Sequence, residues 1–210
     1  GGLAKYGLDY ASIRLLNPRI IYCSITGFGQ NGPYKDRPGY DALIQAMGGL
    51  MSITGEAEQA QQKVGVAVVD LMTAMYATTA ILAAVNHRHV TGEGQHIDLA
   101  LFDVQAAMLA NQAATYLLSG QIPTRQGSAH PSIAPYHPMR VQDGFVMLAV
   151  GNDGQFAQLC HAAGLPELAQ DERFATNAQR TRNRKDLESA LEPAMLQKTI
   201  DEWVALGEQN

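Results

Sequence analysis

The sequence predicts an α/β protein in two parts, a layered α/β domain followed by a small α+β domain. The first part alternates apolar segments typical of strands with longer helical patterns, which is characteristic of an α/β layer. Apolar periodicity then disappears over residues 119–136, which are rich in Gly, Pro and Ser, and this indicates a linker at residues 121–136. Strand patterns come first after this linker, and helical patterns follow. We therefore expect domains at residues 1–120 and 137–210.

Periodicity assigns the elements of the first part. Residues 19–26 are rich in Ile and Tyr and predict a buried strand, while residues 70–89 carry the clearest helical pattern. Residues 96–101 alternate between apolar and polar side chains and predict a second strand. Further helices are expected within residues 1–18, at 40–51 and at 103–118.

The second part begins with a predicted β-hairpin. Residues 137–141 and 145–150 flank Gln142-Asp143-Gly144, and Asp-Gly is a preferred sequence in hairpin turns. Helices are expected at 153–163, 184–197 and 199–207.

Composition narrows the classes of function. Of the 210 residues, 46% are hydrophobic and 17% are charged, and the net charge is −5 with no basic run, which argues against nucleic acid as a partner. No stretch is judged long and apolar enough to cross a bilayer, since Thr and Tyr interrupt the best candidate at residues 71–85. Neither Cys23 nor Cys160 lies in a CxxC pair, so a reducing, cytoplasmic compartment is expected.

A glycine motif follows the first predicted strand. Gly27-Phe28-Gly29-Gln30-Asn31-Gly32 has the GxGxxG spacing of dinucleotide-binding loops. That interpretation requires a helix directly after the loop, and Pro33 makes one unfavourable. A flexible turn, or a loop that lets a ligand approach the backbone, remains the alternative.

Asp70 lies where the longest helix is expected to begin. By position alone an aspartate there is most simply an N-cap. The same position stabilises an ionised carboxylate, which can attack an acyl carbon, while nearby backbone N–H groups hold developing negative charge. Spacing does not separate the two interpretations. Asp103 has the same placement, and capping is the preferred interpretation there.

Two further features are candidate sites. His87 and His89 do not share a helical face, so we expect no shared metal and prefer an interaction with the helix C-terminus. Gly127-Ser128-Ala129-His130-Pro131-Ser132 is most simply a linker, although such loops can also close over a reactive intermediate.

Taken together, a series of short motifs resembles the class III CoA-transferase family, the CaiB/BaiF type that includes formyl-CoA transferases and carnitine CoA-transferases. The match keeps one order along nearly the whole chain. Its motifs are Asn17-Pro18-Arg19-Ile20-Ile21-Tyr22, Gly27-Phe28-Gly29, Gly32-Pro33-Tyr34, Pro38-Gly39-Tyr40-Asp41, Gly48-Gly49-Leu50-Met51, Thr54-Gly55, Val69-Asp70, Thr91-Gly92-Glu93-Gly94-Gln95, Gly127 to Tyr136 and Asp171 to Asn177.

The resemblance implies a larger assembly. Family members are roughly twice this length, so the chain resembles their middle portion, with part of a Rossmann-like large domain and part of a small α+β domain. It also implies an interlocked homodimer, in which each subunit is threaded through the other.

The resemblance also implies a reaction. Coenzyme A would move from an acyl-CoA donor to a small carboxylic acid, with Asp70 as the covalent nucleophile. Acyl-CoA and the acids would be substrates, with no metal and no permanently bound cofactor.

Other site residues are implied in the same way. Tyr40 would contact substrate near the thioester, and Lys5 and Tyr6 fall where the family contacts the adenine end of CoA. Gly127 and His130 lie where some members have a glycine-rich loop that shields the intermediates, although this sequence has only one glycine there.

Three alternatives remain open. An α-methylacyl-CoA racemase needs two acid–base groups, and Tyr40 stands where such racemases have a histidine. A catalytically idle acyl-CoA-binding domain would keep the fold without the chemistry. A nicotinamide-dependent oxidoreductase is the weakest, since it depends on the GxGxxG motif alone.

Overall fold

The computed structural model describes residues 2–209, and its contacts divide the chain into two compact units, Gly1–Arg125 and Gln126–Asn210. The division falls inside the segment 121–136 that the sequence analysis assigned as a linker. Ala134, near the end of that segment, is fully buried in the core of the second unit. The two units are described separately below.

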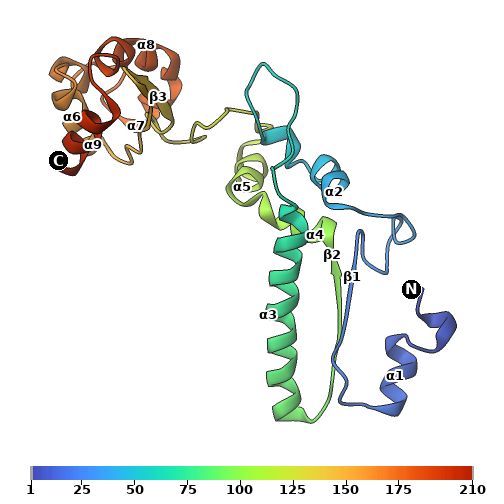
Figure 1. Cartoon of the computed structure of the whole chain (residues 1–210). Helices are drawn as coiled ribbons and strands as arrows, with labels where there is room; N and C mark the ends of the chain where they lie inside the picture. Colours follow the sequence, from blue (N-terminus) through green and yellow to red (C-terminus); the bar gives the residue numbers. More distant parts are fainter. Residues whose placement is uncertain (1, 210) are drawn as a thin grey trace. The chain divides into compact units, whose positions relative to one another are not determined.

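The first unit is mixed α/β (Figure 1). Its elements in chain order are η1 (Ala4–Tyr6), α1 (Tyr10–Leu16), β1 (Tyr22–Thr26), α2 (Asp41–Met47), η2 (Met51–Ile53), α3 (Val68–Thr91), β2 (His96–Ala100), α4 (Leu101–Met108) and α5 (Ala110–Ser119).

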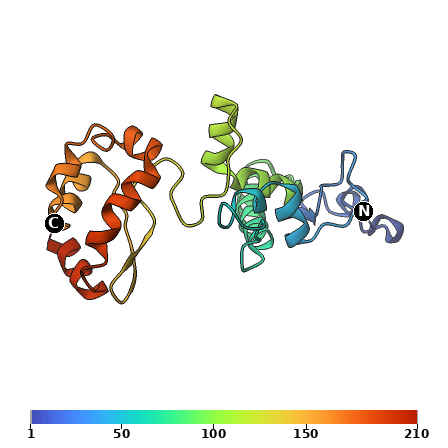
Figure 2. The ribbon, with the colours of Figure 1, turned by 90° about the horizontal axis from the view of Figure 1, so that it is seen from above.

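The two strands of this unit, β1 and β2, pair in parallel, from Tyr22 opposite His96 to Thr26 opposite Ala100. Parallel strands require a crossover connection, and α3 provides its long helical part. Figure 1 shows α3 running beside the pair, and Figure 2 looks along its axis. The expected strand–helix–strand order is therefore present.

Helix α3 ends where glycine permits it. Gly92 has φ 81°, in the left-handed region, and its N–H donates to the carbonyl of Arg88 at 2.9 Å. Gly94 then packs so closely against the backbone of Ile20 that a Cβ atom there would overlap it. These two contacts explain the Gly-Glu-Gly spacing of the sequence.

Contrary to the sequence expectation, α3 has the length and apolar composition of a membrane-spanning helix. A single helix of this kind is weak evidence for insertion, although only 22% of its most apolar window is buried in the protein. Val69, Thr73, Ala77 and Ala84 form its buried face.

The predicted helix 103–118 is wrong in one respect, because it is divided into α4 and α5. The break lies at Leu109 and Ala110, and Ala110 has φ 44°, which is unfavourable for a residue with a Cβ atom. Apolar residues continue across the break, so the pattern gave no sign of it.

The second unit contains a hairpin and several helices. Its elements are β3 (Pro138–Val141), β4 (Gly144–Met147), α6 (Asp153–Ala162), η3 (Pro166–Ala169), α7 (Asn177–Arg182), α8 (Arg184–Met195) and α9 (Ile200–Gln209). The predicted hairpin is confirmed, but Val141 pairs with Gly144 across a turn of Gln142 and Asp143, so Gly144 lies in β4 and not in the turn.

Helix α7 was not predicted. It has six residues, too few for apolar periodicity to be visible. Its start is nevertheless encoded locally, because Thr176 and Gln179 form a reciprocal capping box.

Candidate functional site

Asp70 is the third residue of α3, and its side chain is exposed. The expectation that it caps the helix is wrong, since the N-cap residue is Ala67, which offers no side-chain hydrogen bond. Asp103 likewise lies third in α4, whose N-cap is Ala100. Both carboxylates therefore lie in a first turn, where the helix dipole favours negative charge.

The cap that Ala67 cannot supply comes from another helix. The Oδ1 atom of Asp41 accepts a hydrogen bond from the backbone N–H of Val69 at 2.8 Å. Asp41 is the first residue of α2 and directly follows Tyr40. This bond therefore joins the chain next to Tyr40 to the chain next to Asp70.

A buried glutamine fixes the other oxygen of the Asp41 carboxylate. Gln45 is fully buried, and its Nε2 donates to Oδ2 of Asp41 at 2.6 Å. Its Oε1 accepts from the backbone N–H of Val64 at 2.9 Å, just before α3. A carboxylate and an amide thus connect two backbone donors that flank the start of α3.

Apolar packing holds the two helices beneath this network. Ile44 of α2 and Val69 of α3 are both fully buried, and Leu101 of α4 completes the cluster. Gly48 lies so close to the Gln105 side chain that a Cβ atom would overlap it. The starts of α2 and α3 are therefore fixed by both packing and hydrogen bonds.

The first-turn N–H groups of α3 are not all engaged. Val68 donates to the carbonyl of Val66 at 2.8 Å, and Val69 donates to Asp41. Within residues 2–209 the N–H of Asp70 has no hydrogen-bond partner. That donor is free to stabilise negative charge that develops near the carboxylate.

The GxGxxG motif has a different explanation from nucleotide binding. The backbones of Gly27 and Gly39 lie in contact, and a Cβ atom on either would overlap the other. The carbonyl of Gly27 accepts from the N–H of Phe102 at 3.0 Å, at the start of α4. Because α2 begins only after Gly39, no helix follows the motif directly, and the dinucleotide interpretation fails.

Tyr40, Lys5 and Tyr6 are exposed. Tyr40 is 75% exposed at the N-terminus of α2, and its side chain accepts no capping hydrogen bond. Lys5 and Tyr6 lie together in η1, with the Lys5 ammonium 4.9 Å from the centre of the Tyr6 ring. Within residues 2–209, no hydrogen bond, ion pair or ring contact joins this pair to Tyr40 or Asp70.

Gly127 and His130 belong to the second unit. Gly127 has φ 59°, and the N–H of Ala129 closes a turn onto Gln126 at 3.0 Å. The His130 ring stacks on Tyr136 with 5.3 Å between ring centres. Arg184 donates to the His130 carbonyl at 2.7 Å, so the segment is anchored at this point.

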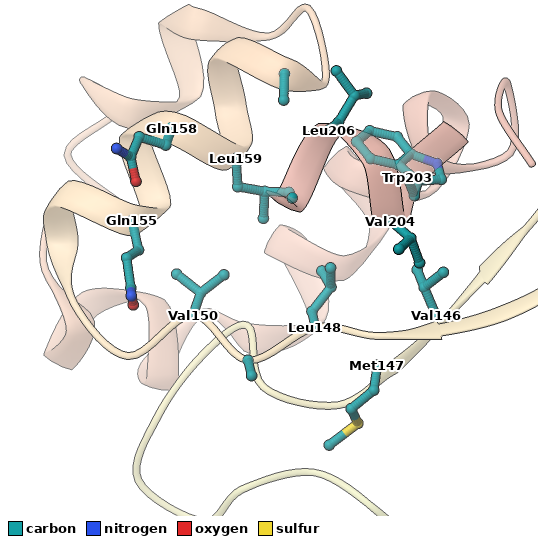
Figure 3. Close-up of a pocket in the computed structure, with 13 residues that line it drawn as sticks. Val146, Met147, Leu148, Val150, Gln155, Gln158, Leu159, Trp203, Val204 and Leu206 are labelled. Atoms are coloured by element: carbon teal, nitrogen blue, oxygen red, sulfur yellow. The ribbon is translucent and has the colours of Figure 1, made fainter. Parts of the chain in front are cut away.

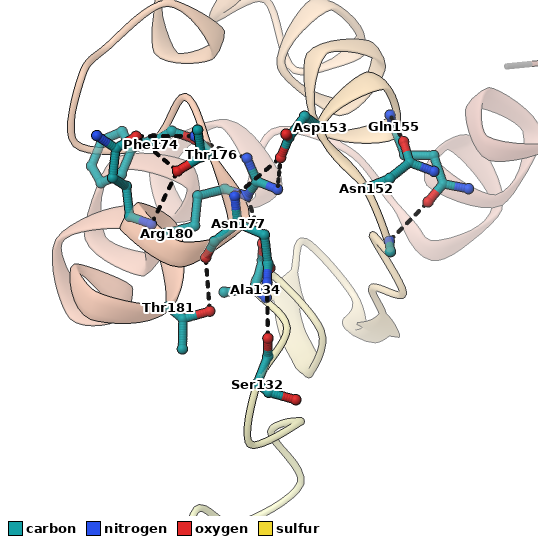
Figure 4. Close-up of polar contacts among 12 residues, drawn as sticks. Ser132, Ala134, Asn152, Asp153, Gln155, Phe174, Thr176, Asn177, Arg180 and Thr181 are labelled. Carbon is teal, nitrogen blue, oxygen red and sulfur yellow. Dashed lines mark hydrogen bonds and ion pairs between the residues drawn. The ribbon is translucent and has the colours of Figure 1, made fainter. Parts of the chain in front are cut away.

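Side chains of α6 and α7 hold the segment that follows His130 (Figure 4). Asn177 donates to the carbonyl of Ser132 at 2.9 Å and accepts from the N–H of Ala134 at 3.2 Å. The fully buried Arg180 donates to the carbonyl of Ala134 at 2.8 Å and to Oδ1 of Asp153 at 2.7 Å. Asn177, at the end of the Asp171 to Asn177 motif, and Arg180 therefore hold residues 132–134 in place by hydrogen bonds.

A cavity of about 340 Å³ opens in the second unit between β4, α6 and α9 (Figure 3). Trp203, Leu159 and Val146 contribute to its mainly apolar lining. A smaller cavity of about 280 Å³ in the first unit is lined by Tyr22 and His96 among others. Neither cavity includes a residue that the sequence analysis assigned to a site.

Burial perturbs the pKa of both cysteine thiols, which lie outside the predicted site. Burial raises the pKa of the Cys160 thiol to about 11, and the Arg180 charge opposes this effect. Burial also raises the pKa of the Cys23 thiol. In the part of the chain that the structure describes, no group of three His, Cys, Asp or Glu side chains could hold a metal ion.

Sequence reasoning missed Asp41 and Gln45. The motif Pro38-Gly39-Tyr40-Asp41 was noted, but only Tyr40 was given a role. A signal was present, since Asp and Gln four residues apart share a helical face and hydrogen-bond. The third partner, Val69, lies 28 residues from Asp41, and no local pattern could reveal it.

The fold and the site define a mixed α/β protein that presents one carboxylate in the first turn of its central helix and a tyrosine at the start of the neighbouring helix. The sequence profile of CoA-transferase family III matches residues 1–210. The chain belongs to this family.

Individual relatives agree with this assignment. A succinate–glutarate CoA-transferase of Agrobacterium fabrum is 57% identical over 186 residues, which are 89% of this chain and 46% of the relative. The succinyl-CoA:glutarate CoA-transferase of Homo sapiens is 41% identical over 208 residues, which are 99% of this chain and 48% of the relative. The chain spans about half the length of these curated relatives.

Solved structures show the same fold. The crystal structure of a CAIB/BAIF family protein from Brucella suis matches all of this chain with a TM-score of 0.83 and 53% sequence identity, over 56% of that protein's chain. The crystal structure of Rv3272 from Mycobacterium tuberculosis matches with a TM-score of 0.88 and 30% identity, over all of this chain and 55% of the other.

Proposed function

We propose that this chain is part of a CoA-transferase that moves coenzyme A from an acyl-CoA donor to a small carboxylic acid. The observation that carries the proposal is the match to CoA-transferase family III along the whole chain. The relatives named for succinate, succinyl-CoA and glutarate support succinyl-CoA as donor and a dicarboxylic acid such as glutarate as acceptor.

In the proposed mechanism, the Asp70 carboxylate attacks the thioester carbonyl of the donor. The C–S bond breaks, and a mixed anhydride and a free CoA thiolate result. The thiolate then attacks the aspartyl carbonyl, which releases the donor acid and leaves an aspartyl-CoA thioester. The exposed position of Asp70 in the first turn of α3 supports this role, because the carboxylate is accessible to substrate and lies beside a free backbone N–H.

The second half of the reaction reverses these steps on the acceptor. The acceptor carboxylate attacks the aspartyl thioester and displaces the thiolate, which forms a second mixed anhydride. The thiolate attacks the acyl carbonyl of the acceptor, so the acceptor leaves as its CoA thioester and Asp70 is regenerated. The free N–H of Asp70 is suited to stabilise the oxyanion of these tetrahedral intermediates.

The remaining site residues have proposed roles. Tyr40, exposed beside Asp41, contacts substrate near the thioester. Lys5 and Tyr6 contact the adenine end of CoA. Gly127 and His130 belong to a loop that covers the intermediates, and its anchoring by Arg184 supports a defined conformation.

Two features of the complete protein are also proposed. The first unit would be part of a Rossmann-like domain, which its parallel strands support. The protein would act as a cytoplasmic homodimer.

The experiment uses the complete protein with succinyl-CoA and glutarate, and mass spectrometry follows the acyl-CoA products. Hydroxylamine added during turnover should modify Asp70, because it captures activated acyl groups. Asp70→Ala should abolish transfer while the circular dichroism spectrum stays unchanged. Asp103→Ala is the matched control, since that carboxylate occupies the same position in α4, and it should retain transfer.

Other results would contradict the proposal. An unmodified Asp70 in protein that is turning over would exclude the covalent mechanism. Deuterium incorporation at the substrate α-carbon would instead support a racemase. Binding of acyl-CoA with no product from any acid would support an idle binding domain.

A further inference from the structure

We propose that Asp41 is a positioning residue that holds the Asp70 carboxylate in the geometry required for attack. The proposal rests on the function proposed for Asp70. It starts from the hydrogen bond between the Asp41 carboxylate and the N–H of Val69, one residue before Asp70.

Asp41 replaces a missing N-cap. A side-chain oxygen at the N-cap normally accepts from the second or third N–H of the helix. In α3 the N-cap is Ala67, and the second N–H belongs to Val69. Asp41 therefore performs from α2 the task that Ala67 cannot perform, and it ties the first turn of α3 to a different helix.

The Asp41 carboxylate has one defined orientation. Its two oxygens accept from different donors, the N–H of Val69 and the Nε2 of Gln45. Gln45 is itself fixed, because it is fully buried and its Oε1 accepts from the N–H of Val64. The hydrogen bonds thus run from the N–H of Val64 through Gln45 and Asp41 to the N–H of Val69. Because a backbone donor stands at each end, one of the two side chains between them must be a carboxylate, which only accepts, and the other an amide.

The hydrogen bond between Asp41 and Val69 affects the positions of both Tyr40 and Asp70. Tyr40 precedes Asp41, and Asp70 follows Val69, so the 2.8 Å bond sets the separation of the two helix starts. Attack on a thioester requires the carboxylate to be aligned with the reacting carbon, and a displacement of about 1 Å can cost roughly 100-fold in rate. Asp41 therefore matters for reaction rate more than for substrate affinity.

The test is Asp41→Asn in the complete protein. The new amide would place its NH₂ group against the NH₂ group of Gln45 or against the N–H of Val69. Rotating either amide does not help, because two hydrogen-bond donors then face each other at a different position. We expect kcat to fall about 10- to 100-fold, with KM for succinyl-CoA little changed. The rate of hydroxylamine modification at Asp70 should fall by the same factor as kcat.

A double variant distinguishes positioning from simple loss of stability. Asp41→Asn combined with Gln45→Glu exchanges the amide and the carboxylate, so every donor again has an acceptor. Part of the lost kcat should return. Recovery should be incomplete, since the relocated carboxylate would lie at the fully buried position of Gln45, where burial disfavours the charged form. Asp103→Asn is the control and should keep the original kcat.

Two results would overturn the inference. One is an Asp41→Asn protein with unchanged kcat and unchanged modification of Asp70, whatever its melting temperature. The other applies if Asp41→Asn does not fold, and it is an unchanged kcat in Gln45→Met. That variant keeps the Asp41 carboxylate but removes the donor to one of its oxygens, so positioning requires its kcat to fall.

The proposed function fails separately. If Asp70 of the original protein is not modified during turnover, the covalent mechanism is wrong regardless of the result for Asp41. If Asp70 is modified but Asp41→Asn has no effect on the rate, only the positioning role is wrong.

Discussion

The backbones of Gly27 and Gly39 are in direct contact, and neither position has room for a Cβ atom. Gly27 directly follows β1, and Gly39 lies two residues before Asp41. The contact therefore closes the loop between β1 and α2 and fixes where α2 begins. The position of Tyr40 depends on it.

Gly27→Ala should destabilise the first unit by about 1–3 kcal/mol, the usual cost of overpacking. The added methyl group would overlap Gly39, and neither backbone can move without disturbing β1 or α2. Urea unfolding followed by circular dichroism measures the change. Gly65→Ala is the control, because nothing lies within 4 Å of a Cβ atom there, and its effect should stay within about 0.5 kcal/mol. Equal stabilities for the two variants would show that the loop can open at low cost.

The sequence was sufficient for elements whose signal is local. The helical pattern of residues 70–89 lies within α3, and the Asp-Gly sequence correctly indicated a hairpin of β3 and β4, although Gly144 itself lies in β4. The break between α4 and α5 left no trace, since Ala110 adopts its unusual backbone angle within a continuous apolar run.

Contacts between distant segments could not be predicted. The sequence shows that Gly27 belongs to a glycine-rich loop, but not that Gly39 is the backbone it must accommodate. Asp41 was overlooked for the same reason, because its role depends on Val69 in a different helix. Asp70 was correctly placed at a helix start, but the source of the cap depends on the tertiary structure.

Arg180→Met should destabilise the second unit by roughly 1–3 kcal/mol for each buried carbonyl that it leaves unpaired, while its ion-pair partner Asp153 is itself exposed to solvent. The fully buried guanidinium donates to the carbonyls of Ala134 and Phe174 and to Asp153, and methionine would leave all three acceptors without this donor. The fluorescence of Trp203, the only tryptophan in the chain, reports unfolding of this unit.

The control for this prediction is Arg182→Met, since Arg182 lies on the same helix and is exposed. Its stability should be close to that of the original protein. Hydrogen exchange should also become faster at the N–H of Ala134 in Arg180→Met. Unchanged exchange at Ala134 would mean that Asn177, which accepts from that N–H, holds the loop without Arg180.

The stability of the second unit should fall as pH decreases below 6.5, because of His137. Burial lowers the pKa of His137 from its ordinary value of 6.5, while the nearby Glu188 opposes this shift and Arg184 adds to it. In the unfolded chain His137 takes up a proton near pH 6.5, but in the folded protein it does so only at lower pH. The unfolded state therefore binds more protons in this interval, and the free energy of unfolding decreases as pH falls.

His137→Gln should remove this dependence. The measurement compares urea unfolding by Trp203 fluorescence at pH 7.5 and pH 5.5 in both proteins, and the original protein should lose more stability than the variant. The carboxylates should not contribute to this difference between pH 7.5 and pH 5.5. The lowered pKa values of Asp171 and Glu202 change the free energy of unfolding only below about pH 4.5. If the original protein is more stable at pH 5.5 than at pH 7.5, attraction between His137 and Glu188, 3.6 Å apart, must outweigh burial.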